Sequence, residues 1–368
     1  MKIIILGTGS AQKDIIEYCK NRSFYVIACS NVAGYSSEKL VNEFHQIDIV
    51  DADSVKKLAI DSEVDFIYTI GSDVAMPTIA KVSREIGLPC FVDYETAVMC
   101  NNKDMLRDKV RSTGKYSRVS HQVLRSSDDK VIVPFPAMIK PSDSQGQRGV
   151  RKVENIDDVR RYFSETVSFS RSKKVIIEPY IEGDEISVNV FLENGELRFY
   201  LMSDREAWTE YPGGIIKGHR IPSKYEANTI VAERIRTLVI ETLEAIGLRN
   251  GPGYFQIKID DEGYPFLIEV TPRLDGCHMW RLIKYSTGVD LLDASVEMLQ
   301  GGGYNQAREY KVIPYSLEFF CGKPGTRFSQ SNYSITEQEF LRWYYQEGDT
   351  VNHVNGYFEK CGYVITKG

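Results

Sequence analysis

The sequence contains little that would suit a membrane or a nucleic acid. No apolar segment of the 368 residues approaches the roughly 18 consecutive residues that a bilayer-spanning helix needs. The 45 lysine and arginine residues are outnumbered by 51 acidic ones, and no basic cluster is available to bind phosphate backbones. The start, Met1–Gly7, is one charge and a short apolar run, which is not the form of a signal peptide. We therefore expect a cytoplasmic protein without nucleic-acid or membrane partners.

Cysteine is present but not arranged in a metal-binding pattern. The seven cysteines are scattered, odd in number and never spaced as CxxC. This spacing favours reduced thiols, buried or exposed, over a zinc site. They are Cys19, Cys29, Cys90, Cys100, Cys277, Cys321 and Cys361.

The first 97 residues alternate strand and helix signals. Their composition is that of a globular protein, and the chain has room for two or three domains. Glycine and proline close the last helix at Gly87 and Pro89. This rhythm predicts a parallel, doubly wound sheet. The expected strands are Ile3–Leu6, Tyr25–Cys29, Phe66–Ile70 and Cys90–Val92, with helices over Asp14–Lys20 and Ala75–Ile86.

From about residue 98 the pattern changes to a helix followed by strands. An Asn194-Gly195 turn separates two of the strands and indicates a hairpin, so we expect this block to be antiparallel. The helix covers Lys103–Ser112, and the strands are Val131–Val133, Ala137–Lys140, Val175–Glu178, Ile186–Leu192 and Leu197–Ser203.

The remaining third contains one long helix with an apolar face, Asn228–Ile246, which stops at Gly247. Two strands joined by a turn follow this helix, and the tail from about residue 310 mixes strands with one short helix. The expected elements are strands Phe255–Asp260 and Pro265–Val270 and helices Leu291–Leu299 and Glu337–Tyr345.

A glycine turn, Gly7-Thr8-Gly9-Ser10, lies between the first strand and the first helix, where backbone N–H groups could hold a phosphate. A dinucleotide fingerprint has a third glycine where this chain has Gln12. We interpret the turn as a means of packing strand and helix closely.

A lysine followed by a flexible loop is a more specific motif. A strand delivers Lys140 to one place, and residues 142–150 then supply serines, glycines and free N–H groups that can fold over an anion. Lysine and loop together predict a polyphosphate site. The alternative is an exposed hairpin loop with a surface lysine.

The next motif begins where Glu178 ends an apolar strand. Pro179 removes a donor but leaves carbonyl groups free, and Glu185 starts another strand. This arrangement suits an adenine edge read by backbone groups, with a carboxylate further along for ribose hydroxyls. An ordinary acidic turn is the alternative.

A carboxylate in the last strand pair needs a cation. Glu269 and Thr271 are two residues apart and share one face of their strand. A buried carboxylate is costly unless a metal or a basic group meets it. The alternative to a metal is a salt bridge to Lys258 or Arg273.

In order and spacing these motifs resemble the ATP-grasp superfamily, specifically its carbamoyl-phosphate-synthetase-like and carboxylate–amine ligase members. The resemblance covers essentially the whole chain. It implies an α/β fold, α+β in the ATP-grasp part, in which a Rossmann-like pre-ATP-grasp domain precedes a two-lobed ATP-grasp domain. The expected divisions are 1–97 (Rossmann-like), 98–203 (lysine, phosphate loop and adenine strand), 204–310 (metal site) and 311–368 (C-terminal extension).

The same resemblance implies residue roles. Arg273 would hold the transferring phosphate or the acyl group and, with Lys140, be catalytic. Mg²⁺, with Mn²⁺ as a substitute, would bind Gln256, Glu269 and Thr271. The implied ATP site consists of Lys103 and Lys140, the loop residues Gly146, Gln147, Arg148, Gly149 and Val150, the adenine residues Glu178, Tyr180 and Ile181, and the ribose-binding Glu185.

Two metal positions depart from the family pattern. Thr271 offers one hydroxyl oxygen where asparagine is common, and Gln256 replaces a more frequent acid. The expected reaction is ADP-forming ligation of a carboxylate to an amine, with small-molecule substrates and a homodimer as candidate assembly. A silent nucleotide-binding regulatory protein is an alternative that Thr271 supports. A nicotinamide-dependent oxidoreductase would explain the glycine turn but not Lys140 or Glu269.

The substrate carboxylate is expected beside the glycine-rich segment 208–223. Its Gly-His-x-x-Pro-Ser core resembles the border of the acceptor pocket in carboxylate–amine ligases, and Arg220 could hold a carboxylate in a bidentate fork. Arg281 could approach the same pocket from the other side. His219, Arg220, Arg273 and Arg281 are thus the candidate substrate residues; a surface loop capped by Ser223 is the alternative.

Overall fold

The computed structural model describes residues 1–116, 119–210, 215–335, 337–353 and 358–368. Part of the expected substrate segment, residues 211–214, lies outside these ranges. The described helices include none with the length and apolar character that a bilayer crossing requires.

The front of the chain forms the expected parallel sheet, with strand order β3-β2-β1-β4. Ile3, Ile4 and Ile5 are all buried, because helices cover both faces of this sheet. The predicted strand Cys90–Val92 is wrong: these residues pair with none of the described strands, and the Phe91 ring packs edge-on against Tyr68. The elements are β1 (Lys2–Leu6), α1 (Ser10–Asn21), β2 (Tyr25–Cys29), β3 (Glu43–His45), α2 (Ala52–Asp61), β4 (Phe66–Tyr68), α3 (Met76–Ile86) and α4 (Tyr94–Asn101).

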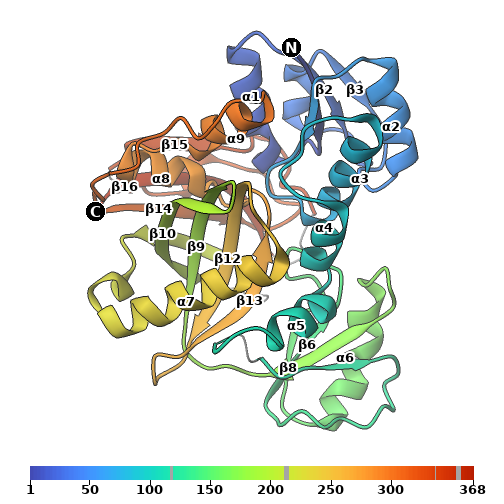
Figure 1. Ribbon diagram of the computed structural model, residues 1–368, viewed down its shortest axis with the longest axis vertical. Coiled ribbons are helices and arrows are strands. Elements are labelled where there is room, and N and C mark those ends of the chain that lie inside the picture. The colour runs from blue at the N-terminus through green and yellow to red at the C-terminus, as the bar shows by residue number, and fades with distance from the viewer. Residues whose placement is uncertain (117–118, 211–214, 336, 354–357) are drawn as a thin grey trace.

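A small antiparallel sheet follows, in the order β5-β8-β6-β7, and forms the lower lobe in Figure 1. The predicted strand Val131–Val133 is wrong. Ile132 is 74% exposed, and its N–H donates to the side chain of Gln122 instead of to a neighbouring strand. The elements are α5 (Lys103–Arg111), β5 (Gln122–Leu124), β6 (Ala137–Pro141), β7 (Arg151–Val153), α6 (Ile156–Ser168) and β8 (Val175–Pro179).

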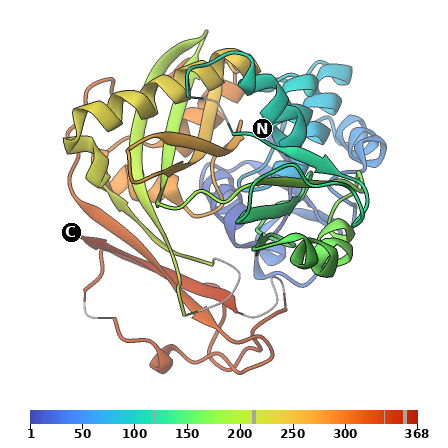
Figure 2. The same cartoon turned by 90° about the horizontal axis from the view of Figure 1, so that it is seen from below.

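The third sheet has eight strands in the order β13-β12-β9-β10-β11-β14-β16-β15 and continues into the C-terminal strands, which are red in Figure 2. The predicted Asn194-Gly195 turn is confirmed, and both residues adopt the positive φ that such hairpin turns need. The elements are β9 (Asp184–Glu193), β10 (Glu196–Ala207), β11 (Ile216–Ile221), α7 (Thr229–Ile246), β12 (Gly251–Ile259), β13 (Pro265–Thr271), α8 (Met279–Thr287), α9 (Leu291–Leu299), β14 (Tyr315–Gly322), β15 (Phe340–Trp343) and β16 (Glu359–Lys367).

The two faces of this large sheet differ in character. Helix α7 lies across one face (Figure 1), with its N-terminus capped by Asn228 and its C-terminus ended by Gly247. The apolar side chains of α7 pack there against Val188, Phe255 and Val270. Because side chains alternate along a strand, the intervening residues point to the opposite face. Phe191 and Leu201 of that face belong to a second apolar core cluster, whereas the part formed by Ser187, Gln256 and Glu269 is polar and is called the polar face below.

The short helix predicted at Glu337–Tyr345 is wrong. Residues Phe340–Trp343 form the edge strand β15 and pair with β16, with Phe340 opposite Ile365. Long-range pairing and ring contacts, such as that between Phe340 and Tyr363, decide the conformation of this segment.

Candidate active site

A cavity of about 520 Å³ lies between the small sheet and the polar face of the large one. Its walls come from α5, β6, β8, β9, β12 and β13 and from the loop after β6. Most of the residues predicted for an ATP and metal site line it: Lys103, Lys140, Gly146, Gln147, Arg148, Val150, Glu178, Tyr180, Ile181, Glu185, Gln256 and Glu269. Gly149, Thr271, Arg273, His219, Arg220 and Arg281 are not among its lining residues.

A buried ion-pair cluster forms one wall. The Glu178 carboxylate, 2% exposed, accepts a hydrogen bond from Arg107 Nε at 2.6 Å and another from Lys140 Nζ. A second Arg107 nitrogen donates to the Ile268 carbonyl at 2.8 Å, which ties α5 to β13. Burial alone would raise the pKa of Glu178, but Arg107 and Lys140 outweigh it and lower that pKa to about 2.

Arg107 is one residue of this cluster that the sequence reasoning missed. It is 1% exposed, and arginine is rarely buried unless it is paired. The pairing also bears on Glu178, which was expected to read adenine. In this structure the Glu178 carboxylate is engaged by two cations and orders the Lys140 ammonium. Burial lowers the pKa of Lys140, and the charge of Glu178 opposes this effect.

The adenine and ribose candidates are also held by neighbours. The Tyr180 N–H donates to the Pro136 carbonyl at 2.9 Å, so the backbone of Tyr180 has only its carbonyl left to offer a base. Glu185 accepts hydrogen bonds from Arg205 and from the side-chain amide of Gln256. Arg205 is a second residue that sequence reasoning missed.

Glu269 differs from these carboxylates because it has no hydrogen-bond or ion-pair partner among the described residues. It is half-buried on the cavity wall and forms no hydrogen bond or ion pair within the described part of the chain. Both basic residues proposed as salt-bridge partners point elsewhere: Lys258 donates to the Gly183 carbonyl at 3.0 Å, and Arg273 pairs with Asp73. The cavity therefore exposes a carboxylate that a cation could neutralise.

Strand register places further polar groups on the same face as Glu269. Gln256 lies opposite Glu269, and Tyr254 lies opposite Thr271. The Thr271 hydroxyl is buried and has no hydrogen-bond partner among the described residues. Buried polar atoms normally find a partner, so this hydroxyl marks a place where a ligand atom would fit.

The loop after β6 is anchored at its base. Asp143 accepts hydrogen bonds from the Ser170 hydroxyl at 2.6 Å and from the Ser172 N–H at 2.8 Å. Further along, the Gln145 side chain accepts the Asp73 N–H at 2.8 Å, and Lys103 Nζ donates to the Ser144 carbonyl at 2.7 Å. Asp143 and Gln145 therefore hold the first half of the loop at its two ends, and the Lys103 ammonium contacts the loop between them.

Comparison with known proteins agrees with this geometry. Residues 133–280 match the family model described as the ATP-grasp domain.

The chain belongs to the ATP-grasp superfamily.

Known proteins match different shares of the chain. The chain is similar to carbamoyl-phosphate synthase from Methanobrevibacter smithii, with 28% identity over 53% of this chain and 53% of that protein. The chain thus spans about half the length of the curated relatives it matches. Among solved structures, L-amino acid ligase from Bacillus licheniformis superposes with a TM-score of 0.81 at 16% identity, covering 99% of this chain and 92% of that one. Phosphoribosylglycinamide synthetase from Anaerococcus prevotii gives 0.74 at 18% identity over 100% and 93%.

The structural likeness confirms the expected ATP-grasp fold, with a parallel-sheet domain before two antiparallel lobes. At these identities the likeness establishes the fold alone. The chemistry of this ATP-grasp chain therefore rests on its own residues.

Two predicted substrate residues do not come together in the ATP-grasp cavity. Arg220 is 60% exposed and pairs with Glu206, because alternation along β11 turns it away from the face that His219 occupies. Arg281 pairs with Asp14 of α1, a carboxylate that His278 and Trp280 also contact. Their expected role in one carboxylate pocket gains no support from this arrangement.

Arg273 lies just beyond the cavity. It pairs with Asp73 and donates to the Leu274 carbonyl at 3.0 Å. Burial raises the pKa of Asp73, although Arg273 opposes this effect. Because Gln145 also binds the Asp73 N–H, Asp73 connects the phosphate-loop candidate to the arginine expected to act in catalysis.

The glycine turn in the front domain is filled by protein. The Gln12 amide oxygen accepts the Gly9 N–H at 3.0 Å, and its nitrogen donates to the Ile70 carbonyl. An N–H group that a phosphate would need is thus already engaged. The packing interpretation of this turn agrees with the structure, and the oxidoreductase alternative gains nothing from it.

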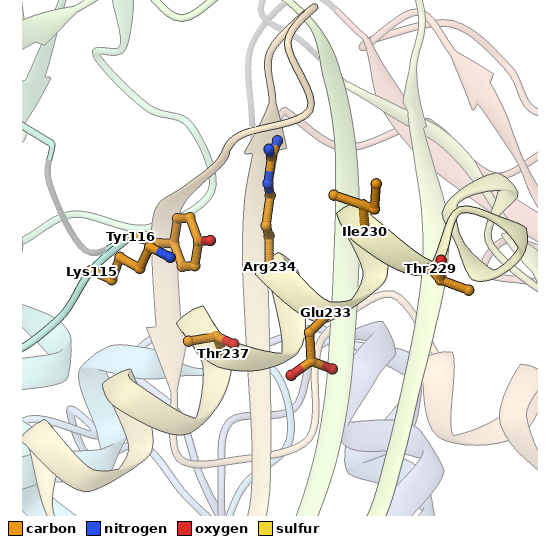
Figure 3. A pocket seen from close by; sticks show the side chains of 7 residues that line it. All are labelled: Lys115, Tyr116, Thr229, Ile230, Glu233, Arg234 and Thr237. Atoms are coloured by element: carbon orange, nitrogen blue, oxygen red, sulfur yellow. The ribbon is translucent and has the colours of Figure 1, made fainter.

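A second hollow of about 470 Å³ lies on the outer side of α7, away from these residues (Figure 3). It holds no predicted site residue, and Arg234 extends there to donate to the Glu262 and Gly263 carbonyls. Its lining residues are Lys115, Tyr116, Thr229, Ile230, Glu233, Arg234 and Thr237.

Proposed function

We propose that this chain is an ATP- and Mg²⁺-dependent ligase. It would activate a carboxylate as an acyl phosphate, transfer the acyl group to an amine, and release ADP and phosphate. The observation that carries the proposal is that two lysines, Lys103 and Lys140, and an anchored glycine loop share one cavity with Glu269. The carboxylate of Glu269 has no ion-pair partner in the part of the chain that the structure describes.

The residues present fit a magnesium ion. Glu269 offers an unpaired carboxylate, and Thr271 offers a buried hydroxyl without a partner among the described residues. The nitrogen of the Gln256 amide is used by Glu185, so its oxygen is the atom left for a ligand. These are the oxygen ligands that Mg²⁺ takes, and Mn²⁺ could replace it. When bound, the ion would neutralise charge on the phosphates during transfer.

The remaining residues have roles consistent with this chemistry. A carboxylate is a poor electrophile at neutral pH, and phosphorylation gives it a good leaving group. Lys140, held in place by Glu178, and Lys103 would stabilise the phosphate oxygens. Arg273 would hold the phosphoryl or acyl group once substrate binding draws it from Asp73. Closure of the loop 144–150 would keep water from the acyl phosphate.

The polar face of the large sheet offers a path for the second substrate. From Glu269 it runs across Gln256 and Ser187 toward β10 and β11, where Arg205 lies opposite His219. Burial, Arg205 and Lys360 lower the pKa of His219 well below its ordinary value, so its imidazole is neutral. A small polar carboxylate or amine would find hydrogen-bond groups along this face.

An ADP-release screen over pairs of carboxylates and amines tests the proposal. We expect at least one pair to give ADP and phosphate in equal amounts, with mass spectrometry showing a product that lacks one water relative to the pair. Glu269→Gln is the inactive control. Stoichiometric AMP and pyrophosphate would contradict an acyl-phosphate route. Nucleotide binding without turnover over a broad panel would favour the silent regulatory alternative.

A further inference from the structure

Three side chains with metal-binding atoms meet at the far end of the polar face. His219 comes from β11, and Asp275 and Cys277 come from the turn that follows β13. One ligand atom from each lies within 4.8 Å of the others. His219 is more than fifty positions away from the other two residues in the sequence, so only the packing of the turn against β11 brings it to them.

The histidine is held in a buried position without a partner. His219 is 1% exposed, and neither of its ring nitrogens has a hydrogen-bond partner in the described ranges. A buried imidazole without hydrogen bonds costs free energy, and native proteins seldom leave both nitrogens in that state. The ring therefore has a nitrogen available for a ligand at the point where Asp275 and Cys277 converge.

The other two residues are oriented by hydrogen bonds. The Asp275 carboxylate accepts the Cys277 N–H at 2.7 Å and the Met279 N–H at 3.0 Å, one on each oxygen. Each oxygen keeps a further lone pair for a ligand. Lys360 Nζ of β16 approaches Cys277 Sγ at 3.5 Å. Partners of this kind commonly fix metal ligands in place.

We propose that His219, Asp275 and Cys277 form a binding site for a divalent transition-metal ion of the Zn²⁺ class. Imidazole, thiolate and carboxylate together suit zinc and its neighbours, whereas Mg²⁺ prefers oxygen ligands alone. The site is therefore distinct from the oxygen-lined one proposed at Glu269. Three protein ligands leave one position of a tetrahedral ion for water or a substrate atom.

Two positive side chains lie next to this site. Arg205 lies opposite His219, and Lys360 lies beside Cys277, so their charges repel a bound cation. The charges of Asp275 and the Cys277 thiolate have to offset the ion. Loss of either negative charge should weaken metal binding markedly. A bound ion would also join β11 to the turn that carries Arg273.

Cobalt(II) binding to the full chain, metal-free, reduced and without nucleotide, tests the proposal. Co²⁺ reports thiolate ligation by a charge-transfer band in the near ultraviolet. We expect one equivalent to bind, to show this band, and to be displaced by Zn²⁺. Cys277→Ser should abolish the band, and Asp275→Asn, which keeps the side-chain shape, should weaken binding at least ~10-fold. Cys90→Ser, which alters a thiol outside the cluster, should leave the charge-transfer band and the affinity for Co²⁺ unchanged.

The readout requires no ligase activity, so its outcome is separate from that of the proposed function. A folded Cys277→Ser that binds Co²⁺ with the wild-type spectrum would overturn the site. Loss of binding in Glu269→Gln would also overturn it by placing the ion in the other site. If a cluster variant does not fold, the melting temperature of the wild-type protein is measured with and without one equivalent of Zn²⁺. A melting temperature that does not rise with Zn²⁺ contradicts the proposal.

Discussion

Replacing Arg107 with methionine would test the buried cluster that supports the cavity. Methionine keeps most of the side-chain length but removes the charge that pairs with Glu178 at 2.6 Å and the donor to the Ile268 carbonyl. Removing one partner of a buried ion pair costs about 3–5 kcal/mol, because the other charge stays buried without compensation. Lys140 still binds Glu178, so we expect a loss of about 3 kcal/mol in the free energy of unfolding.

The pKa of Glu178 supports the same magnitude. Its drop from the ordinary value of 4.5 to about 2 corresponds to about 3 kcal/mol, which is what the two cations contribute beyond the opposing cost of burial. Because the folded-state pKa is lowered, this stabilisation is fully present above pH 4.5 and is lost as the pH falls toward about 2. In Arg107→Met the pKa should rise toward its ordinary value. The difference in the free energy of unfolding between wild type and variant should then become smaller as the pH falls from 4.5 toward about 2.

Urea denaturation followed by circular dichroism, repeated across that pH range, measures both quantities. Arg111→Met is the matched control, since Arg111 lies on the same helix but is exposed. The double variant Arg107→Met/Glu178→Gln should recover part of the loss, because the uncompensated charge is gone. If Arg107→Met is no less stable than Arg111→Met, or if the gap does not depend on pH, the reasoning is refuted.

Three further predictions concern the proposed metal ligand, the two arginines predicted to bind substrate and a glycine. Glu269→Gln should stay folded yet lower ADP release roughly 100-fold to 1000-fold, because the variant loses the charge proposed to bind Mg²⁺. Near-normal ADP release from a folded variant would count against the site. Arg281→Ala should lower the free energy of unfolding by about 1–3 kcal/mol, because the buried Asp14 loses a charged partner. Arg220→Ala should change the stability measured in thermal melts by less than about 0.5 kcal/mol. Equal effects of the two substitutions would contradict the Asp14 contact. Gly183→Ala should destabilise the chain by more than about 2 kcal/mol, because Gly183 has φ +130° and an added Cβ would lie 2.0 Å from the Ile259 carbonyl oxygen. Its control, Gly247→Ala, also has a positive φ but meets nothing within 4 Å, so a similar loss in both would point to backbone strain alone.

Short-range patterns in the sequence determined much of the architecture. The apolar run at Ile3–Leu6, the helix closed by Gly87 and the Asn194-Gly195 hairpin all form as predicted, because each depends on residues a few positions apart. The cavity candidates were also identifiable. Strand periodicity sets the side to which Glu269 points, so its face followed from neighbouring residues alone.

Tertiary structure decided the partners. Arg107 resembles any helix arginine until β8 places Glu178 against it, 71 residues away. Segment 337–345 has aromatic residues that suit several conformations, and pairing with β16 makes Phe340–Trp343 within it a strand. Arg281 is drawn to Asp14 of the front domain, and Cys277 meets His219 only after the turn packs on β11. The sequence by itself determined which residues could bind ligands, because side-chain chemistry and strand periodicity are local. Which of them face one another was decided by long-range packing, because the free energy of a buried charge depends on neighbours that are distant in the sequence.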